Sequence, residues 1–392
     1  MIAYNKAMLD NVVVQQEAAK AFKQGCISNE EKSNIDGQYP VSFYTPNLFI
    51  RLGMFVLTYI ITFFSLGFLL FLLMSDNSSD YEKAIGIICL IFSIIAYILL
   101  EVVVRSKNNY RSGIDDGLMW MVVGISFGSI MALAHMYTAN TVSCAVLFII
   151  AGFISVRFAN RIISVIAYLS FLGILFFLCS YFGGIIKAIV PFILMTASAG
   201  IYFIIDKIKT QQRLRYHIDC LEVVSVATLI TFYAAGNYYV VRELSNAMFD
   251  LNLLPGQTIP FGWLFWIFTI ITPIAYLGAG IKNKSTVFIR IAMLLFAATC
   301  FTIRNYYSFA PVEIIMTIGG TVLIIGAYSL MNFLAMPKNG FTYEEILSDS
   351  PIDGLQIESL LIAEILPQQH IPADTNKFGG GSFGGGGAAG EY

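Results

Sequence analysis

Ten long apolar stretches alternate with short polar segments along this chain of 392 residues, and they constrain its fold more than any other feature. A helix needs about 20 apolar residues to cross the hydrocarbon layer of a membrane. By that measure the spans are Phe49–Met74, Ala84–Val104, Gly117–Tyr137, Thr141–Val156, Ile162–Phe182, Gly184–Ile205, Cys220–Val240, Phe261–Ile281, Thr286–Ile303 and Val312–Met336. The sequence therefore predicts an all-α fold, a polytopic transmembrane helical bundle of about ten spans.

The composition supports this prediction. Hydrophobic residues make up 57% of the chain, whereas a soluble globular protein has about 45–50% even when glycine is counted. So much apolar surface indicates the lipid bilayer as a partner. The net charge of −2 gives no reason to expect a nucleic acid partner. The six cysteines and three histidines show no spacing typical of metal ligands, so we expect no metal and no cofactor.

The positions of lysine and arginine predict the orientation, because these residues stay on the cytoplasmic side when they lie in short loops. Lys207–His217 (KIKTQQRLRYH), which we call the basic strip, lies between two apolar spans. With the N-terminus inside, all of the 23 lysines and arginines fall on inner segments except Lys83, Lys187, Arg242 and Arg304. We therefore expect both termini and the basic strip to be cytoplasmic.

By composition the chain divides into four segments. Residues 1–47 are predicted to be a cytosolic helical segment and residues 48–336 the transmembrane bundle. Residues 337–377 form a second cytosolic segment, in which Leu355–Leu366 is apolar enough for an amphipathic helix at the membrane surface. Residues 378–392 are predicted to be a flexible Gly-rich tail, because glycine loses much backbone entropy on ordering.

The N-terminal segment has the pattern of a helical hairpin. The spacing of Leu9 and Val12 predicts a first helix, which Gly25 ends. Ser28-x-x-Glu31 is a capping box that opens a second short helix. One interpretation is an amphipathic lead-in to the membrane. The other is a docking module for a cytosolic protein partner.

Polar side chains in or at the edges of the spans are the candidate sites, because a charge is costly in lipid. They are Glu101, His135, Glu222, Arg290, Arg304, Asn305 and Glu313. Glu101 lies four residues before Arg105, which predicts an ion pair within one helix. No acidic residue falls clearly at the middle of a span. This weighs against a proton-driven carrier and favours salt bridges at the membrane boundary.

One short pattern occurs twice. Gly236-Asn237-Tyr238-Tyr239 closes the seventh span and Arg304-Asn305-Tyr306-Tyr307 closes the ninth, both on the predicted outer side. An aromatic belt of tyrosines at the headgroup level is one interpretation, and a small outward-facing polar pocket is the other. The short loop after the ninth span also predicts that Arg304 and Glu313 interact, directly or through Asn305.

Glycine and proline indicate how the helices meet. Gly124-x-x-x-Gly128 in the third span is predicted to let a neighbouring backbone approach closely. The same is predicted for Ala197–Gly200, Gly278–Gly280 and Gly319–Gly320. Pro191 in the sixth span and Pro273 in the eighth are predicted helix kinks, because proline leaves a backbone carbonyl without its helical partner.

The run FKQGCISNEE at Phe22–Glu31, followed by FIRLG at Phe49–Gly53, resembles bacterial membrane proteins of the domain of unknown function 2157 family. In that family a short cytosolic segment leads directly into an apolar helical array. The resemblance covers the N-terminal segment and the first span. It implies this architecture and a bacterial inner-membrane location. The family has no established activity, so the resemblance implies no catalytic residues.

No Walker A sequence and no H-E-x-x-H motif is present. We therefore expect a non-enzymatic scaffold, sensor or assembly partner that acts through its cytosolic ends. The alternative is a small-solute transporter with a five-plus-five helix arrangement, whose second half would repeat the first in inverted orientation. Matching halves should have matching helix breaks, and the first five spans contain no proline. The sequence leaves substrate, partner and oligomeric state open.

Overall fold

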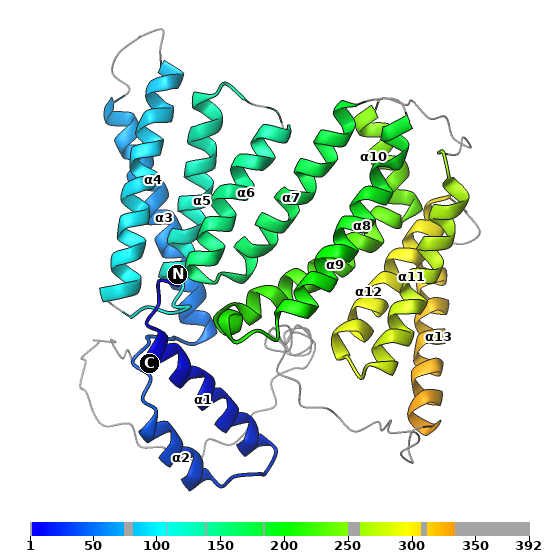
Figure 1. Ribbon diagram of the computed structural model, residues 1–392, viewed down its shortest axis with the longest axis horizontal. Coiled ribbons are helices and arrows are strands. Elements are labelled where there is room, and N and C mark those ends of the chain that lie inside the picture. Colours follow the sequence, from blue (N-terminus) through cyan, green and yellow to red (C-terminus); the bar gives the residue numbers. More distant parts are fainter. Residues whose placement is uncertain are drawn as a thin grey trace, which may run out of the picture. The chain divides into compact units, whose positions relative to one another are not determined.

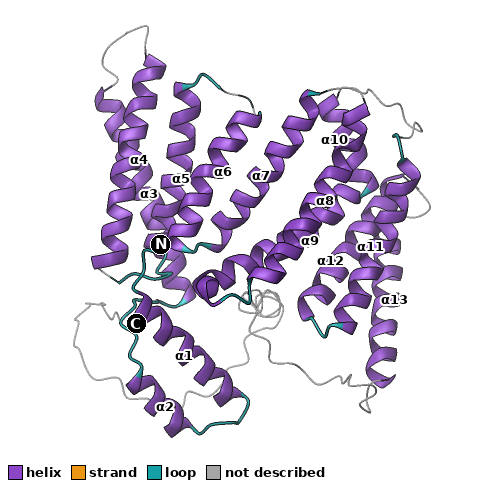
Figure 2. Cartoon of the chain, in the orientation of Figure 1, coloured by secondary structure: helices purple, strands orange, loops and turns teal. Residues whose placement is uncertain are grey.

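The computed structural model describes residues 2–73, 81–106, 108–136, 138, 140–182, 185–249, 259–306 and 312–333. Within these ranges the chain forms thirteen α-helices, one short 3₁₀ helix and no β-strand. Figure 2 shows the helices and the loops that connect them. The predicted all-α fold is confirmed. The segments predicted for residues 337–377 and 378–392 lie outside the described residues.

Two helices, α1 (Lys6–Lys23) and α2 (Asn29–Gln38), precede the apolar part of the chain. The elements that follow are α3 (Leu48–Leu73), α4 (Tyr81–Ser106), α5 (Ile114–Leu133), α6 (Thr141–Phe158), α7 (Arg161–Tyr181), α8 (Ile185–Ile208), η1 (Gln212–His217), α9 (Ile218–Gly236), α10 (Tyr238–Phe249), α11 (Gly262–Lys282), α12 (Thr286–Tyr306) and α13 (Val312–Phe333).

Nine of the described helices are long and apolar enough to cross a membrane, namely α3 to α9, α11 and α12. The chain is therefore a multi-pass membrane protein. These helices range from 18 residues in α6 to 26 residues in α3 and α4. The tenth predicted span, Val312–Met336, corresponds to α13. The apolar part of α13, Thr317–Ser329, is shorter than the spans of the other nine helices, so α13 is not counted among them.

Consecutive helices pack against each other in pairs. α4 packs on α5, α6 on α7, α8 on α9 and α11 on α12, and α3 packs mainly on α5 (Figure 1). α7 also contacts α8 and α9, so it joins the earlier helices to the later ones. A five-plus-five arrangement would divide the helices after the fifth span, which is α7. At that point the two groups are in direct contact, because α7 packs against α8 and α9.

Large apolar side chains along the spans are exposed. Phe49 is 85% exposed and Phe64 70% exposed on α3, Ile149 is 68% exposed on α6, and Phe203 is 69% exposed on α8. Contiguous apolar surface of this kind is rare on soluble monomers. In a multi-pass protein it is the surface that faces lipid.

The N-terminal hairpin forms as its sequence predicts. α1 ends at Lys23, and Gly25 then takes a φ of 71°, which glycine adopts without strain. At the start of α2 the backbone N–H of Glu31 donates to Ser28 Oγ at 3.2 Å, and the N–H of Ser28 donates to Glu31 Oε2 at 2.7 Å. The capping box is confirmed. The bond from the Ser28 backbone lowers the pKa of the Glu31 carboxyl.

Two predictions about the spans are wrong. The seventh span does not continue as one helix to Val240, because α9 ends at Gly236 and Asn237 begins α10. Gly124 and Gly128 do not admit a neighbouring backbone, since a Cβ at either position would meet nothing within 4 Å. A Cβ at Gly200, Gly278 or Gly320 would likewise meet nothing within 4 Å, and one at Gly319 would meet Cys300 Sγ at 3.4 Å. Gly280 does lie in close contact, because a Cβ there would be 3.0 Å from the backbone nitrogen of Ile289 in α12.

Candidate functional site

Several sets of ion-paired and hydrogen-bonded side chains lie where the N-terminal segment meets the ends of six helices, and we call them together the junction. Each member is linked to another by a hydrogen bond or an ion pair. The members are Tyr4, Asp10, Arg51, Glu101, Arg105, Arg111, Asp115, Asp116, Arg157, Arg161, Arg215 and Asp219.

Asp115, in the first turn of α5, is a fully buried member of the junction, with 0% exposure. Its Oδ2 accepts hydrogen bonds from the backbone N–H of Arg111 at 2.8 Å and from the Tyr4 hydroxyl at 3.1 Å. Its Oδ1 accepts from the backbone N–H and the hydroxyl of Ser112, at 2.9 Å and 3.0 Å. A buried carboxylate is tolerated only when it is bonded in this way. Asp115 therefore fixes Tyr4 onto the loop that precedes α5.

The loop before α5 has an uncommon backbone. Asn108, Arg111 and Gly113 have φ values of 49°, 53° and 94°. A Cβ at Gly113 would lie 2.1 Å from the carbonyl oxygen of Arg51, so only glycine fits there. The two non-glycine residues cost free energy in this conformation. The bonds that the loop makes to Asp115 offset that cost.

The neighbouring carboxylate, Asp116, binds α3 and the start of α7. Its Oδ2 accepts hydrogen bonds from Arg51 Nη2 at 2.5 Å and Nε at 3.1 Å. Its Oδ1 accepts from the side-chain nitrogen of Asn160, the N-cap of α7, at 3.0 Å. Asp115 and Asp116 thus bind different elements from adjacent positions of one helix.

Asp219, in the first turn of α9, joins that helix to α7 and to the loop before α5. It forms an ion pair of 2.6 Å with Arg161 at the start of α7, and a second with Arg111 of the loop before α5. The Asp219 carboxylate therefore carries the network from the earlier helices to α9.

Glu101 confirms one prediction and adds to it. It pairs with Arg105 at 2.9 Å within α4, as the spacing predicts. It also accepts hydrogen bonds from Arg157 at the end of α6, at 2.8 Å and 3.1 Å, and from the Tyr97 hydroxyl at 2.9 Å. This second arginine makes the pair a link between helices.

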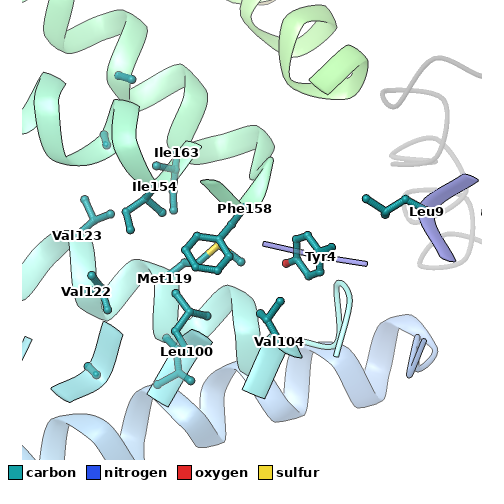
Figure 3. Close-up of a cluster of buried hydrophobic side chains, with 14 of the residues drawn as sticks. Tyr4, Leu9, Leu100, Val104, Met119, Val122, Val123, Ile154, Phe158 and Ile163 are labelled. Carbon is teal, nitrogen blue, oxygen red and sulfur yellow. The ribbon is translucent and has the colours of Figure 1, made fainter. Parts of the chain in front are cut away.

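Tyr4 connects the junction to the hydrophobic core of the first helices. Figure 3 shows its ring beside Phe158, among side chains that include Leu100 and Val104. The ring centres of Tyr4 and Tyr110 are 5.0 Å apart in an edge-to-face contact. Burial, and next the negative charge of the carboxylate to which it donates, raise the pKa of the Tyr4 hydroxyl well above its ordinary value. The hydroxyl is therefore a neutral donor.

The hairpin is also bound through the basic strip. Asp10 of α1 accepts a hydrogen bond from Arg215 at 2.8 Å and another from the Tyr216 hydroxyl at 2.9 Å. The backbone N–H of Ala3 donates to the carbonyl of Arg157 at 2.8 Å. The basic strip, predicted from its charge alone, is thus part of the surface on which α1 rests.

A second polar group lies at the break between α9 and α10. Asn237 is 2% exposed and caps α10, because its Oδ1 accepts from the backbone N–H groups of Tyr239 at 2.9 Å and Val240 at 3.2 Å. Its Nδ2 donates to the Tyr233 hydroxyl at 2.9 Å and to Thr302 Oγ1 of α12 at 3.0 Å. Each polar atom of the Asn237 amide group has a protein partner.

The two copies of the repeated pattern meet beside this break. The rings of Tyr238 and Trp266 stack with centres 4.8 Å apart, and Tyr306 meets Tyr238 edge-to-face at 5.0 Å. The guanidinium of Arg242 lies 5.1 Å from the centre of the Tyr306 ring. Asn305, unlike its counterpart Asn237, is exposed. The copies therefore form one packed aromatic cluster in which the two asparagines play different parts.

Other predicted site residues lie away from the junction or outside its bonds. His135 Nδ1 is 3.5 Å from Glu82 Oε2, which places that pair at the opposite end of α4 and α5. Glu222 lies on α9 one turn after Asp219, and within the described residues it makes no ion pair. Arg290 is exposed on α12.

The pairing of Arg304 with Glu313 stays a prediction, because the side chain of Glu313 lies outside the described residues. Arg304 Nε is buried and has no hydrogen-bond partner in the described part of the chain. Pro191 lies inside α8 and Pro273 inside α11, and each helix continues through its proline.

Sequence reasoning missed Asp115 and Asp116. The signal was available, because two adjacent acidic residues open an apolar span directly after Gly113, where the helix dipole favours negative charge. The expectation that no G-x-S-x-G pattern occurs is also wrong, because Gly124-x-Ser126-x-Gly128 is one. That pattern lies inside continuous α5 and not at a strand-to-helix turn, so it lacks the geometry of a hydrolase nucleophile.

The carboxylates of the junction hold helices and loops together through their hydrogen bonds. Asp115, Asp116 and Asp219 all accept hydrogen bonds from arginine, tyrosine, asparagine, serine or backbone N–H groups. In the part of the chain that the structure describes, no three His, Cys, Asp or Glu side chains are placed to hold a metal ion.

The fold and the junction define an all-α, multi-pass membrane protein with an N-terminal helical hairpin bound to its helix ends. No family model, curated protein or solved structure matches the chain. The resemblance to the domain of unknown function 2157 family stays a prediction.

Proposed function

We propose that this protein is a non-enzymatic scaffold or sensor of the bacterial inner membrane, and that its N-terminal hairpin binds a cytosolic protein partner. One observation carries the proposal: the two helices of the hairpin are used differently. α1 buries Leu9 and Ala18 and binds the basic strip through Asp10. α2 has no buried residue. A helix that is held in place and has no buried residue presents most of its surface to a partner.

The junction supports the sensor part of this proposal. Tyr4 and Asp10 tie the hairpin to the start of α5 and to the basic strip. From there, Asp116 and Asp219 reach α3, α7 and α9. A partner that moved the hairpin would therefore act on the ends of several helices at once, through contacts that have a defined geometry.

Site-specific photo-crosslinking in intact cells tests the proposal. A crosslinking residue at Ser33, which is exposed on α2, should give a discrete adduct with a second protein. The same residue at the lipid-facing position Phe64 is the matched control and should not give that adduct. Glu30→Lys, on the exposed surface of α2, should weaken the adduct, whereas Lys23→Gln at the end of α1 should leave it unchanged. Absence of any protein adduct at Ser33 would reject the proposal.

A small-solute transporter is the second candidate, and the break at Asn237 favours it, because discontinuous helices with buried polar groups often form solute sites. Thr302, which binds Asn237, is 2% exposed. For a transporter, Thr302→Cys should react with a membrane-impermeant thiol reagent during turnover. For a scaffold, the same thiol should stay unreactive, because the polar groups around Asn237 then only hydrogen-bond within the protein and position 302 stays buried.

A further inference from the structure

A groove of about 550 Å³ lies between the hairpin and the first turn of α3. Its lining is mixed: Lys32, Asp36, Arg51 and Arg111 contribute charges, and Val12 and Leu48 contribute apolar surface. The volume falls within the range of about 300–1,000 Å³ that is typical of small-molecule sites. Arg51 and Arg111 belong both to the junction and to the lining of the groove, whereas Ser33 and Glu30, proposed to meet a partner, do not line it.

The charges that line the groove favour a ligand with an anionic group. They comprise three cations and one carboxylate. Lys32 has no ion-pair partner among the described residues, and its ammonium lies 5.3 Å from the centre of the Phe22 ring. Arg51 binds Asp116 through Nε and Nη2, which leaves its Nη1 for another acceptor. Arg111 is bound to Asp219 and adds positive charge at the wall.

One oxygen of the carboxylate is unsatisfied. Asp36 Oδ1 is buried and has no hydrogen-bond partner among the described residues. A buried acceptor left in this state is costly. Asp36 lies one helical turn after Lys32, so both side chains belong to the same side of α2. The groove therefore offers an acceptor for a donor group next to cations for an anion.

The position of the groove identifies the source of such a ligand. Leu48 and Arg51, which line it, are in the first turn of α3, and Leu48 begins the first membrane span. Leu48 is 67% exposed, and Phe49 and Leu52 beside it are 85% and 60% exposed. The groove is thus next to the lipid-facing surface of α3, at the level where a span enters the headgroup layer.

We propose that this groove binds the headgroup of a membrane phospholipid, with the phosphate between Lys32 and Arg51 and an ammonium or hydroxyl donor of the headgroup on Asp36. The acyl chains lie along the exposed side chains of α3 at Leu48 and Leu52. Arginine and lysine both suit a phosphate, arginine through parallel N–H groups and lysine as a point charge. The lipid holds the hairpin to the membrane surface, and this role does not depend on the protein partner proposed above.

Native mass spectrometry of the full chain, released from vesicles of phosphatidylethanolamine and phosphatidylglycerol, tests this proposal. The wild-type protein should retain one phospholipid through a detergent exchange that removes the remaining lipid. Lys32→Gln should retain it about tenfold less, because a charge-assisted bond to phosphate is lost. Lys23→Gln removes a lysine from the same hairpin that does not line the groove, and it should retain the lipid as the wild type does.

Two further arms decide the ligand and its orientation. Asp36→Asn should keep the lipid and reduce the preference for phosphatidylethanolamine over phosphatidylglycerol. Glycerophosphate without acyl chains should not raise the melting temperature of delipidated protein, whereas short-chain phospholipid should. Equal retention by Lys32→Gln and Lys23→Gln, with both variants folded by circular dichroism, would overturn the site. Equal protection by glycerophosphate would overturn the membrane as its source, and a peptide segment found in the groove would overturn the lipid as its occupant.

Discussion

At the scale of single residues, the junction depends on positions that accept no other side chain. Gly113 combines a φ of 94° with a backbone neighbour 2.1 Å from where its Cβ would be. Gly25 has a φ of 71° and nothing within 4 Å. Replacing Gly25 would therefore cost only the free energy of an unfavourable backbone conformation, whereas replacing Gly113 would add a steric clash.

We predict that Gly113→Ala destabilises the protein far more than Gly25→Ala. The backbone conformation alone costs a non-glycine residue about 1–2 kcal/mol, which applies to both variants. Only at position 113 must the first turn of α3 also move away, which breaks the contact with Arg51. Melting temperatures of the two variants in the same detergent provide the measurement. Similar losses in both would show that the loop before α5 adapts.

Tyr4→Phe should cost about 1.5–3 kcal/mol, because it removes a hydrogen bond to the buried carboxylate of Asp115. Thermal unfolding at neutral pH checks this value. Tyr216→Phe is a useful comparison, since its hydroxyl donates to a half-exposed carboxylate at Asp10 and should matter less. A smaller loss for Tyr4→Phe than for Tyr216→Phe would contradict the central place of Asp115.

The same tyrosine should produce a pH dependence. The folded protein raises the pKa of Tyr4 well above its ordinary value, which is about 10 in an unfolded chain. Its contribution to stability is fully present below pH 10 and is lost as the pH rises towards the folded pKa, because only the unfolded chain then releases the proton. The difference in melting temperature between wild type and Tyr4→Phe should therefore shrink above about pH 10. A constant difference from pH 8 to 11 would contradict the shift.

At the scale of helices, the sequence predicts well whatever has a local cause. The capping box at Ser28 and Glu31 and the helix end before Gly25 depend on neighbours within a few residues, and both are confirmed. The break at Asn237 was missed, because hydropathy averaged over a span does not detect one capping side chain. The hydrogen bond from Asn237 to Thr302, 65 residues away, forms only in the folded protein, so no local sequence pattern indicates it.

The repeated pattern provides a matched test of this break. Asn237→Ala should cost about 2–4 kcal/mol, since it removes the cap of α10 and takes one hydrogen bond each from the buried Tyr233 and Thr302. Tyr233 keeps its bond to Thr299, and Thr302 keeps its bond to the carbonyl of Ala298. Asn305→Ala, in the second copy, changes an exposed side chain and should cost less than about 0.5 kcal/mol. Thermal unfolding of both variants decides the matter. Equal losses would mean that the copies are equivalent after all.

At the scale of the whole molecule, the sequence predicted the class of fold but not the junction. Apolar length alone indicates the spans. Asp219 meets Arg111 and Arg161 across separations of 108 and 58 residues, and no local pattern reports such pairs. Glu101 was found as a site because it is a charge at the edge of a span, and its pair with Arg105 was predicted because the two are four residues apart. Its second partner, Arg157, lies 56 residues away and was missed, as the partners of Asp219 were.

Orientation is a prediction for the whole molecule. In a variant that retains only one cysteine at a time, a membrane-impermeant thiol reagent added to intact cells should label Thr138→Cys, in the loop after α5. It should not label the exposed native Cys26 or Thr210→Cys at the basic strip, because lysine and arginine place those segments inside. Labelling of Cys26 from outside would invert the assignment.

The unequal lengths of the helices have a consequence for the surrounding bilayer. At about 1.5 Å per residue, the 26 residues of α3 and α4 extend about 39 Å, whereas the 18 residues of α6 extend about 27 Å. A hydrocarbon layer about 30 Å thick leaves the first two too long and α6 slightly short. Tilting relieves the excess, and local thinning of the bilayer relieves the deficit. Because α3 and α6 both present exposed apolar side chains, the lipid beside α3 should be thicker than the lipid beside α6, and membranes of different thickness should hold the protein at different angles.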